Sequence, residues 1–202
     1  MSVSAVVFDV GNVLFGWDPD SFLVRQIADD EERLRFIEDS DFYGWHESLD
    51  GGRPFAEAEA ELSEKFPAYA ELIKSWSGSF GETISGPVPG MHELVAELDE
   101  RNVPLFAITN FSAEFWPPFF AEEQAFFSRF RDILVSGEVK LLKPDPAIYY
   151  LALDRFGLNP REALFVDDRQ INVDAALAVG MAAHLFVDAA DFRARLEDEG
   201  LL

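Results

Sequence analysis

The stretch VVFDVGNVLF, residues 6–15, decides the fold class of this chain. It is an apolar run that holds one carboxylate, Asp9, followed closely by Gly11 and Asn12. Near-continuous apolar runs with β-branched and aromatic residues are typical of strands buried on both faces. The pattern therefore predicts a buried strand that delivers an acidic side chain at its carboxyl end.

Later apolar runs end in polar residues in the same way. They are PLFAITN (104–110), DILVS (132–136), ALFVDD (163–168) and AAHLFVD (182–188). Helical patterns separate these runs, with proline or glycine at their ends, over residues 91–102, 146–157 and 170–180. Alternating strand and helix predicts an α/β fold with a doubly wound, Rossmann-like parallel sheet.

One region does not fit this alternation. It lacks a convincing strand and holds helical patterns at 22–39 and 55–66. We interpret it as a small helical cap inserted after the first strand, with glycines and prolines at 86–90 marking the return to the sheet. The expected boundaries are residues 1–15 and 86–202 for the core domain and residues 16–85 for the helical cap.

Composition excludes several classes of partner. The chain has 202 residues and a net charge of −22, from 38 acidic and 16 basic residues, so we expect it to bind neither nucleic acid nor an anionic membrane. An anion-binding site must then supply positive charge locally. The lack of cysteine excludes a disulfide framework and fits a cytoplasmic protein, and we expect a monomer or a homodimer.

The polar residues at the strand ends form a chemically coherent set. In open α/β sheets, ligands bind outside the carboxyl ends of the strands. Asp9 can serve as a nucleophile, because carboxylates form acyl-phosphate intermediates. Asp167 and Asp168 add negative charge beside it, which predicts a hard divalent cation, Mg²⁺ above all. Thr109 offers a hydroxyl for phosphoryl oxygens, and Lys143 offers a point charge for the transferring group.

These motifs resemble those of the haloacid dehalogenase superfamily, and the match spans nearly the whole chain. FDVGNVLF is similar to the first motif, with Asp9 at the nucleophile position. Thr109–Asn110 stand at the second motif, Lys143 within KPDPAIY at the third, and FVDDRQINVDAALAVG is similar to the fourth.

The resemblance carries further implications for the site. Most members of the superfamily are Mg²⁺-dependent phosphatases that act through an aspartyl-phosphate. The Gly11 carbonyl and Asp168 stand at metal-ligand positions beside Asp9, with Asp167 adjacent. The helical insert resembles the small cap that covers the active site in one branch. A small phosphorylated metabolite is the implied substrate.

Gly11 departs from the usual phosphatase motif, which has a second aspartate at this position as general acid and base. Such assistance is worth about 10²–10⁴-fold in rate. The FD-x-GNV form resembles a subgroup of sugar-phosphate phosphatases that includes glucose-1-phosphate phosphatases. Two alternatives stay open: a metal-independent 2-haloacid dehalogenase, with Arg25 the nearest candidate for halide binding, and a non-catalytic binder of a phosphorylated ligand.

Substrate contacts beyond the phosphoryl group are expected from the cap. Trp45 can stack on a sugar ring and His46 can hydrogen-bond its hydroxyls, although a tryptophan packed in the cap core with a surface histidine is the alternative. Asn12 is expected to shape the loop that aims backbone N–H groups at phosphate, and Asn110 to do the same after its strand.

The segment FSAEFWPPFFAEEQAFFSRF, residues 111–130, holds eight aromatic residues in twenty positions. We expect a hydrophobic helical connection packed on the sheet. A subunit contact or a pocket wall is the alternative.

Overall fold

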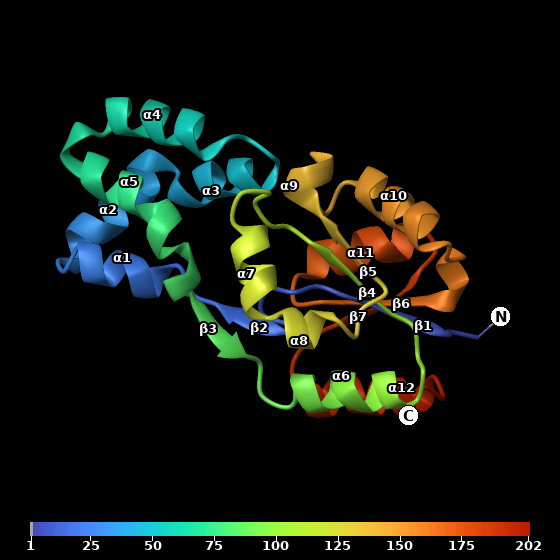
Figure 1. Cartoon of the computed structure of the whole chain (residues 1–202). Helices are drawn as coiled ribbons and strands as arrows, with labels where there is room; N and C mark the ends of the chain where they lie inside the picture. Colours follow the sequence, from blue (N-terminus) through green and yellow to red (C-terminus); the bar gives the residue numbers. More distant parts are fainter. Residues whose placement is uncertain (1) are drawn as a thin grey trace.

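The computed structural model describes residues 2–202 and is built on a five-stranded parallel sheet (Figure 1). Its strand order is β5-β4-β1-β6-β7, and every neighbouring pair is parallel. The strands are β1 (Ala5–Phe8), β4 (Leu105–Thr109), β5 (Asp132–Val135), β6 (Ala163–Asp167) and β7 (Ala182–Leu185). The α/β fold with a doubly wound, Rossmann-like parallel sheet is confirmed.

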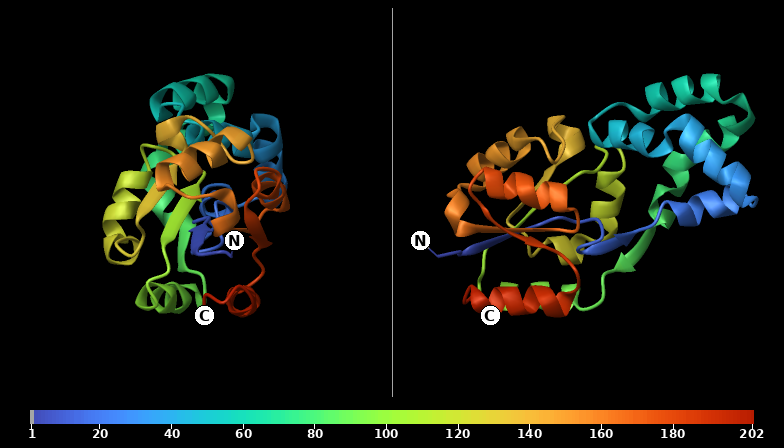
Figure 2. Two further views of the ribbon diagram at one scale, coloured as in Figure 1. Left: turned by 90° about the vertical axis from the view of Figure 1, so that its right-hand side faces the viewer. Right: turned by 180° about the vertical axis from the view of Figure 1, so that it is seen from behind.

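Helices cover both faces of this sheet (Figures 1 and 2). Ala5 and Val7 of β1 join the apolar cluster beneath α10 and α11, whereas Val6 and Phe8 join the cluster on the face of α6 and α12. This alternation follows from the two-residue period of a strand and explains why β1 is apolar without interruption. The four helices are α6 (Met91–Glu100), α10 (Pro146–Phe156), α11 (Gln170–Ala178) and α12 (Ala189–Asp198).

A helical module lies beyond the carboxyl end of β1, opposite the N-terminal end of the sheet (Figure 1). Two antiparallel strands, β2 (Phe15–Trp17) and β3 (Ile84–Pro87), connect it to the core. Between them lie α1 (Asp20–Gln26), α2 (Asp30–Ser40), α3 (Phe42–Asp50), α4 (Phe55–Lys65), α5 (Ala70–Ser79) and the short 3₁₀ turns Pro67–Tyr69 and Phe80–Thr83.

The sequence-based interpretation of this module needs three corrections. Both connecting strands were unexpected, because three- and four-residue strands give too short an alternation to be recognised. The single helix expected at 22–39 is two helices, since Ile27 is extended and Asp29 caps α2 by accepting the Glu32 N–H. A third helix, α3, occupies the region between the expected helices at 22–39 and 55–66, where no helix was expected. Asp41, whose backbone is in the left-handed conformation, makes the one-residue turn before α3.

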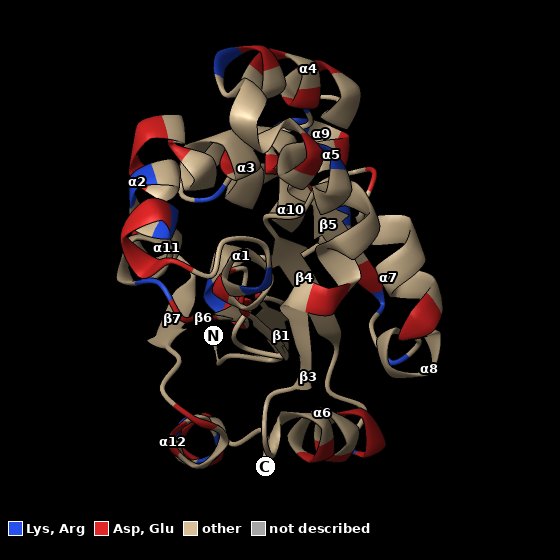
Figure 3. Cartoon of the chain, turned by 90° about the vertical axis from the view of Figure 1, so that its left-hand side faces the viewer, with Lys and Arg blue, Asp and Glu red and all other residues tan. Residues whose placement is uncertain are grey.

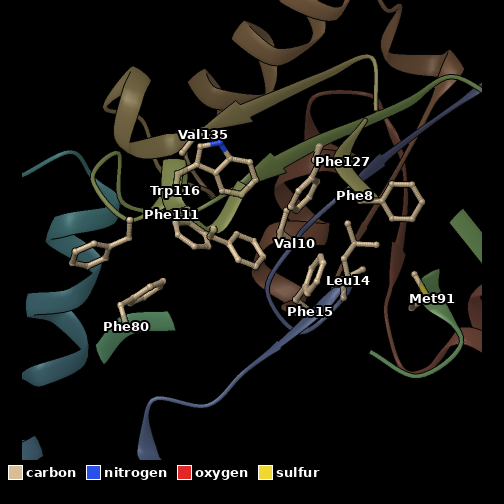
Figure 4. Packing of buried hydrophobic residues seen from close by; sticks show 14 of the residues in the cluster. Phe8, Val10, Leu14, Phe15, Phe80, Met91, Phe111, Trp116, Phe127 and Val135 are labelled. Carbon is tan, nitrogen blue, oxygen red and sulfur yellow. The ribbon is translucent and has the colours of Figure 1, made fainter. Parts of the chain in front are cut away.

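The aromatic segment 111–130 forms α7 (Trp116–Glu122) and α8 (Gln124–Phe127) with their flanking loops. Phe111, Phe119 and Phe127 are buried in the same cluster as Phe8 and Phe15 (Figure 4). The rings meet edge to face or stacked at centroid distances of 5.1 Å (Phe15–Phe119) and 5.5 Å (Phe111–Phe119), within the favourable range for aromatic pairs. The segment is therefore the hydrophobic connection expected, and its N-terminal part reaches the cap.

Acidic residues are spread over helices of the core and of the cap, α4, α6 and α12 among them (Figure 3). Within residues 2–202, no helix combines the length and apolarity that crossing a lipid bilayer requires.

The cap has an aromatic core that can be tested by truncation. Phe42 is fully buried, and its ring centroid lies 5.0 Å from that of Trp76 and 5.5 Å from that of Trp45. We expect Phe42→Ala to lower the free energy of unfolding by about 3–5 kcal/mol, because it leaves a cavity among these rings. Urea denaturation followed by circular dichroism measures this. Tyr150→Ala, at a 58% exposed position, should change stability by less than about 0.5 kcal/mol, and equal losses would contradict this packing.

Candidate active site

Two carboxylates meet where the sheet reverses its winding. The chain passes from β1 to β4 on one side and from β6 to β7 on the other, so β1 and β6 flank the switch point. Phe8 pairs with Val166, and the Asp9 N–H donates to the Val166 carbonyl at 2.9 Å. This register places Asp9 beside Asp167 at the carboxyl edge of the sheet.

Lys143 bridges the two carboxylates. Its Nζ lies 2.8 Å from Asp9 Oδ1 and 2.7 Å from Asp167 Oδ2, and the residue is 1% exposed. The ammonium also lies 5.5 Å from the centroid of the Phe165 ring, within range of a cation–π contact. Asn110 fixes the lysine backbone, since its amide accepts the Lys143 N–H at 2.9 Å and donates to the Lys143 carbonyl at 3.0 Å.

Burial and charge act in opposite directions on these groups. Burial above all, together with the charge of Asp167, raises the pKa of Asp9 to about 8, against the opposing effect of the Lys143 ammonium. Burial also opposes ionisation of Asp167, but Lys143 and hydrogen bonds from the Arg169 N–H and Asn172 bring the pKa of that carboxyl below its usual value. Burial alone would lower the pKa of Lys143, and the two carboxylates raise it instead. The lysine is therefore held as an ammonium.

The carboxylates also form a group that suits a metal ion. Asp9, Asp167 and Asp168 each offer an oxygen, and these atoms lie within 4.8 Å of one another. Burial and the neighbouring charge of Asp167 raise the pKa of Asp168, so a cation there would offset unfavourable charge. An all-oxygen donor set of this kind fits a hard divalent cation such as Mg²⁺.

Hydrogen bonds distinguish the three acids. Both oxygens of Asp167 accept from donors: Oδ1 from the Arg169 N–H and Asn172 Nδ2, and Oδ2 from Lys143 and again from Asn172. On Asp9, the Val10 N–H at 2.6 Å and Lys143 both reach Oδ1, and neither reaches Oδ2. Asp9 thus presents an oxygen for chemistry, while Asp167 is committed to holding Lys143.

A cavity of about 610 Å³ opens above these groups, between the strand ends and the cap. It is lined by core residues and cap residues together, among them Asp9, Gly11, Lys143, Asp168, His46 and Asp50. A smaller, mainly apolar pocket of about 70 Å³ adjoins it and shares Gly11, Trp17, His46, Asp50 and Asn110 with it. The site is thus a chamber roofed by the cap.

Comparison with known proteins identifies the family. The family model described as haloacid dehalogenase-like hydrolase matches residues 3–180. The chain belongs to this family. The match includes β1, the whole cap, the strand ends that carry Asp9 and Asp168, and the loop before α10 that carries Lys143.

Similar proteins within the family include phosphatases. Phosphoglycolate phosphatase of Pectobacterium atrosepticum is 32% identical over 131 residues, 64% of this chain and 52% of that protein, so the chain spans about half the length of this relative. N-acetylmuramic acid 6-phosphate phosphatase of Pseudomonas aeruginosa is 24% identical over 191 residues, 89% of this chain and 80% of that protein.

A solved structure shows the same fold. The HAD family enzyme of Bacteroides thetaiotaomicron in complex with magnesium and inorganic phosphate superposes with a TM-score of 0.71 at 18% identity. The superposition covers 92% of this chain and 95% of that one.

Four substrate-binding residues predicted for this hydrolase have different surroundings. Asn12, with a φ of 57°, accepts the Trp17 N–H at 2.9 Å and hydrogen-bonds Asp168, which fits a loop-shaping role. His46 lines both cavities but is buried at 4% exposure, not at the surface. Asn110 lines the chamber while it holds the Lys143 backbone.

The fourth, Trp45, faces away from the chamber. It is buried in the cap core, and its Nε1 donates to the Ala58 carbonyl at 3.0 Å. Trp45 and His46 are consecutive on α3 and point to different sides of it, and Trp45 is outside the residues that line the chamber, so its stacking on a sugar ring stays a prediction without support from this lining. Thr109 is 1% exposed at the end of β4 and is outside the residues that line the chamber, so its contact with phosphate stays a prediction.

Two residues that line both cavities were missed by sequence reasoning. Trp17 stacks on His46 at a centroid distance of 5.2 Å, and Asp50 ends α3. In the sequence, Asp50 is an acidic residue just before the glycine pair 51–52. This pattern is only a weak indication of function, because it is equally typical of an ordinary solvent-exposed turn. Trp17 gave no signal, because its position depends on the pairing of β2 with β3.

The lysine bridge predicts a pH-dependent loss of stability on substitution. Lys143→Met leaves two buried carboxylates unpaired and should lower the free energy of unfolding by about 3–5 kcal/mol near neutral pH. Without the ammonium, the folded-state pKa of Asp167 rises from below to above the unfolded value of 3.8, and the pKa of Asp9, already raised, rises further. The loss in free energy of unfolding relative to the unaltered protein therefore grows as pH rises, and it should be smaller at about pH 5 than at about pH 8.

Urea denaturation at the two pH values tests this expectation. Lys74→Met removes an exposed ammonium from the cap and serves as the matched control, with an expected change below about 0.5 kcal/mol. A deficit for Lys143→Met that is the same at both pH values would contradict the ion-pair interpretation.

Proposed function

We propose that this hydrolase is a Mg²⁺-dependent phosphomonoesterase that acts on a small phosphorylated metabolite through an aspartyl-phosphate. The observation that carries the proposal is the bridge from Lys143 to Asp9 and Asp167, buried directly beneath a chamber large enough for a metabolite. An ammonium fixed there can stabilise charge on a transferring phosphoryl group while it orients the attacking carboxylate.

Asp9 is the proposed nucleophile. Oδ2 attacks phosphorus, because Oδ1 is held by the Val10 N–H and Lys143. The bond from phosphorus to the leaving oxygen breaks, and the alcohol departs with a proton. Water then attacks the acyl-phosphate, which releases phosphate and restores the Asp9 carboxylate. Thr109 and Asn12 are proposed to hold the phosphoryl oxygens, Thr109 through its hydroxyl and Asn12 through the loop it shapes.

Mg²⁺ is proposed to be held by Asp9, Asp168 and the Gly11 carbonyl. When bound, the ion supplies charge stabilisation for the phosphoryl oxygens and neutralises the cluster of carboxylates. Asp167 was expected among the ligands, but its four hydrogen-bond contacts favour a supporting role, holding Lys143 and the neighbouring Asn172 in place. Arg169, which also lines the chamber, adds positive charge near its rim.

The size and lining of the chamber support a compact substrate. Its volume of about 610 Å³ lies within the usual range of about 300–1,000 Å³ for small-ligand sites. The similar proteins named above act on phosphoglycolate and on a sugar phosphate, both small phosphate monoesters. A sugar phosphate therefore remains within the proposed substrate class, with His46 rather than Trp45 facing it from the cap.

The dehalogenase alternative lacks a matching halide site. Arg25 pairs with Glu82 on the outside of the cap at 2.7 Å and is outside the residues that line the chamber. Without a metal ion, the negative charges of Asp167 and Asp168 would also disfavour the ionised form of the Asp9 nucleophile. The close geometry of Asp9, Lys143 and Asp168 favours turnover over simple binding.

Removal of the nucleophile tests the proposed reaction. We expect the purified protein to release phosphate from a panel of small phosphate monoesters in Mg²⁺ and to stop when the ion is chelated. Asp9→Asn should lower this rate by at least about 10³-fold, because the covalent route is lost. Asp154→Asn, an isosteric change at an exposed position, should keep the full rate. Inactivity across the panel, or chloride release from 2-chloropropionate instead, would contradict the proposal.

Substitution of the proposed metal ligand Asp168 should weaken the binding of Mg²⁺. Asp168→Asn removes a charged oxygen ligand and should raise the Mg²⁺ concentration for half-maximal activity by at least about tenfold. Asp174→Asn lies on α11, the helix that follows Asp168, where its side chain accepts a hydrogen bond from the exposed Gln170, and should leave this concentration unchanged. Equal Mg²⁺ dependence in the two variants would remove Asp168 from the ligand set.

A further inference from the structure

The proposed reaction leaves one role unfilled, because Gly11 carries no side chain to protonate the leaving group. The space beside it is open: a Cβ built on Gly11 would meet no atom within 4 Å. Gly11 lines both the chamber and the apolar pocket, so a group from elsewhere in the chain could reach this space. The cap residue Asp50 lines the same two cavities.

The Asp50 carboxyl is fixed where the cap meets the core. Its side chain is 13% exposed, although the residue lies at the boundary of two cavities. The Ser112 N–H hydrogen-bonds this carboxyl, and the Asp50 carbonyl accepts the Ser136 hydroxyl at 2.6 Å. Next to it, an added Cβ on Gly52 would approach the Gly137 carbonyl to 2.7 Å, so cap and core are in close contact here.

The surroundings of Asp50 disfavour its charged form. It is the last residue of α3, where the negative end of the helix dipole repels a carboxylate. It pairs with His46, whose Nε2 lies 3.7 Å from Asp50 Oδ2. Burial lowers the pKa of His46 to about 4, so the imidazole is neutral and gives no counter-charge. Burial, followed by the charge of Glu47, raises the pKa of Asp50 to about 8.

His46 supplies a second, independent sign that this corner of the chamber is built to meet a ligand. The residue is 4% exposed and is stacked between Trp17, at 5.2 Å, and Phe80, at 5.7 Å. Its Nδ1 is buried without a hydrogen-bond partner among the described residues. Buried polar atoms are normally satisfied, so an unpartnered nitrogen on a residue that lines both cavities points to a ligand group beside that residue.

We propose that Asp50 of the cap is the general acid and base of this enzyme and takes the role that Gly11 leaves vacant. This inference rests on the proposed phosphatase function. In the first step the Asp50 carboxyl gives its proton to the leaving oxygen as the bond to phosphorus breaks. In the second step the Asp50 carboxylate takes a proton from the water that attacks the aspartyl-phosphate, which restores the acid. The His46 imidazole contacts the departing alcohol and keeps it next to Asp50.

Two substrates of different leaving-group acidity separate this role from a positioning role. Glycerol 2-phosphate has a poor leaving group that needs a proton, whereas p-nitrophenolate leaves without one. Asp50→Asn keeps the size of the side chain and its ability to accept the Ser112 N–H. We expect this variant to lose about 10²–10⁴-fold in turnover of glycerol 2-phosphate.

With p-nitrophenyl phosphate, the same variant should release a rapid burst of one nitrophenolate per active site. Slow steady turnover should follow, because water lacks its base and the aspartyl-phosphate accumulates. The burst counts competent active sites, so partial loss of folded protein does not imitate this result. Asp39→Asn, the same acid-to-amide change at an exposed position of the cap, should behave as the unaltered enzyme.

Each outcome is informative about one proposal. Equal losses on both substrates without a burst, or unchanged rates, would overturn the role of Asp50 and leave the phosphatase function standing. Inactivity of the unaltered enzyme on both substrates and on the wider panel would overturn the phosphatase function, and with it the role of Asp50.

Discussion

The structure of the site depends on one buried ammonium between two carboxylates. Taking these charges out of water costs several kcal/mol for each ion, and their attraction compensates only when the geometry is good and the remaining hydrogen bonds are made. The surrounding chain meets this condition. Asn110 holds the Lys143 backbone at both its N–H and its carbonyl, and Asn172 and the Arg169 N–H satisfy Asp167. The sheet register that places Asp9 beside Asp167 is therefore a requirement of the chemistry as well as of the fold.

The cap changes the physics of the same groups. The edge of an open sheet faces water, where charges interact weakly, whereas a roofed chamber strengthens every electrostatic contact inside it. Aromatic contacts hold the cap on the core: the ring centroid of Phe80 in the cap lies 5.3 Å from that of Phe111 in the core (Figure 4). The ring centroid of Phe115 lies 4.7 Å from that of Phe80. The aromatic segment 111–130 thus serves the site indirectly, because it joins the sheet to the element that encloses the substrate.

Local patterns predicted the core of this molecule, and nonlocal pairing explains most of what they missed. Strands buried on both faces read directly as apolar runs, and parallel strands end at one edge, so Asp9, Lys143, Asp167 and Asp168 could be grouped from sequence alone. The pairing of β2 with β3 brings together residues some seventy positions apart, and no short pattern records it. Which side of α3 faces the chamber depends on how α3 packs against its neighbours, and one sequence does not reveal that packing. The sequence therefore could not tell that His46 lines the chamber and Trp45 does not.

The balance of charge in the site explains why it needs a cation and why a general acid is better placed on the cap than at position 11. Asp9, Asp167 and Asp168, when ionised, bring three negative charges to the chamber floor, and Lys143 returns one positive charge. An anionic ester approaching a protein of net charge −22 would meet an excess of two negative charges at the site, which a single divalent cation offsets. A further carboxylate at position 11 would leave an excess of one negative charge. An acid on the cap, buried so that it stays neutral until it gives up its proton, supplies the same proton without that charge.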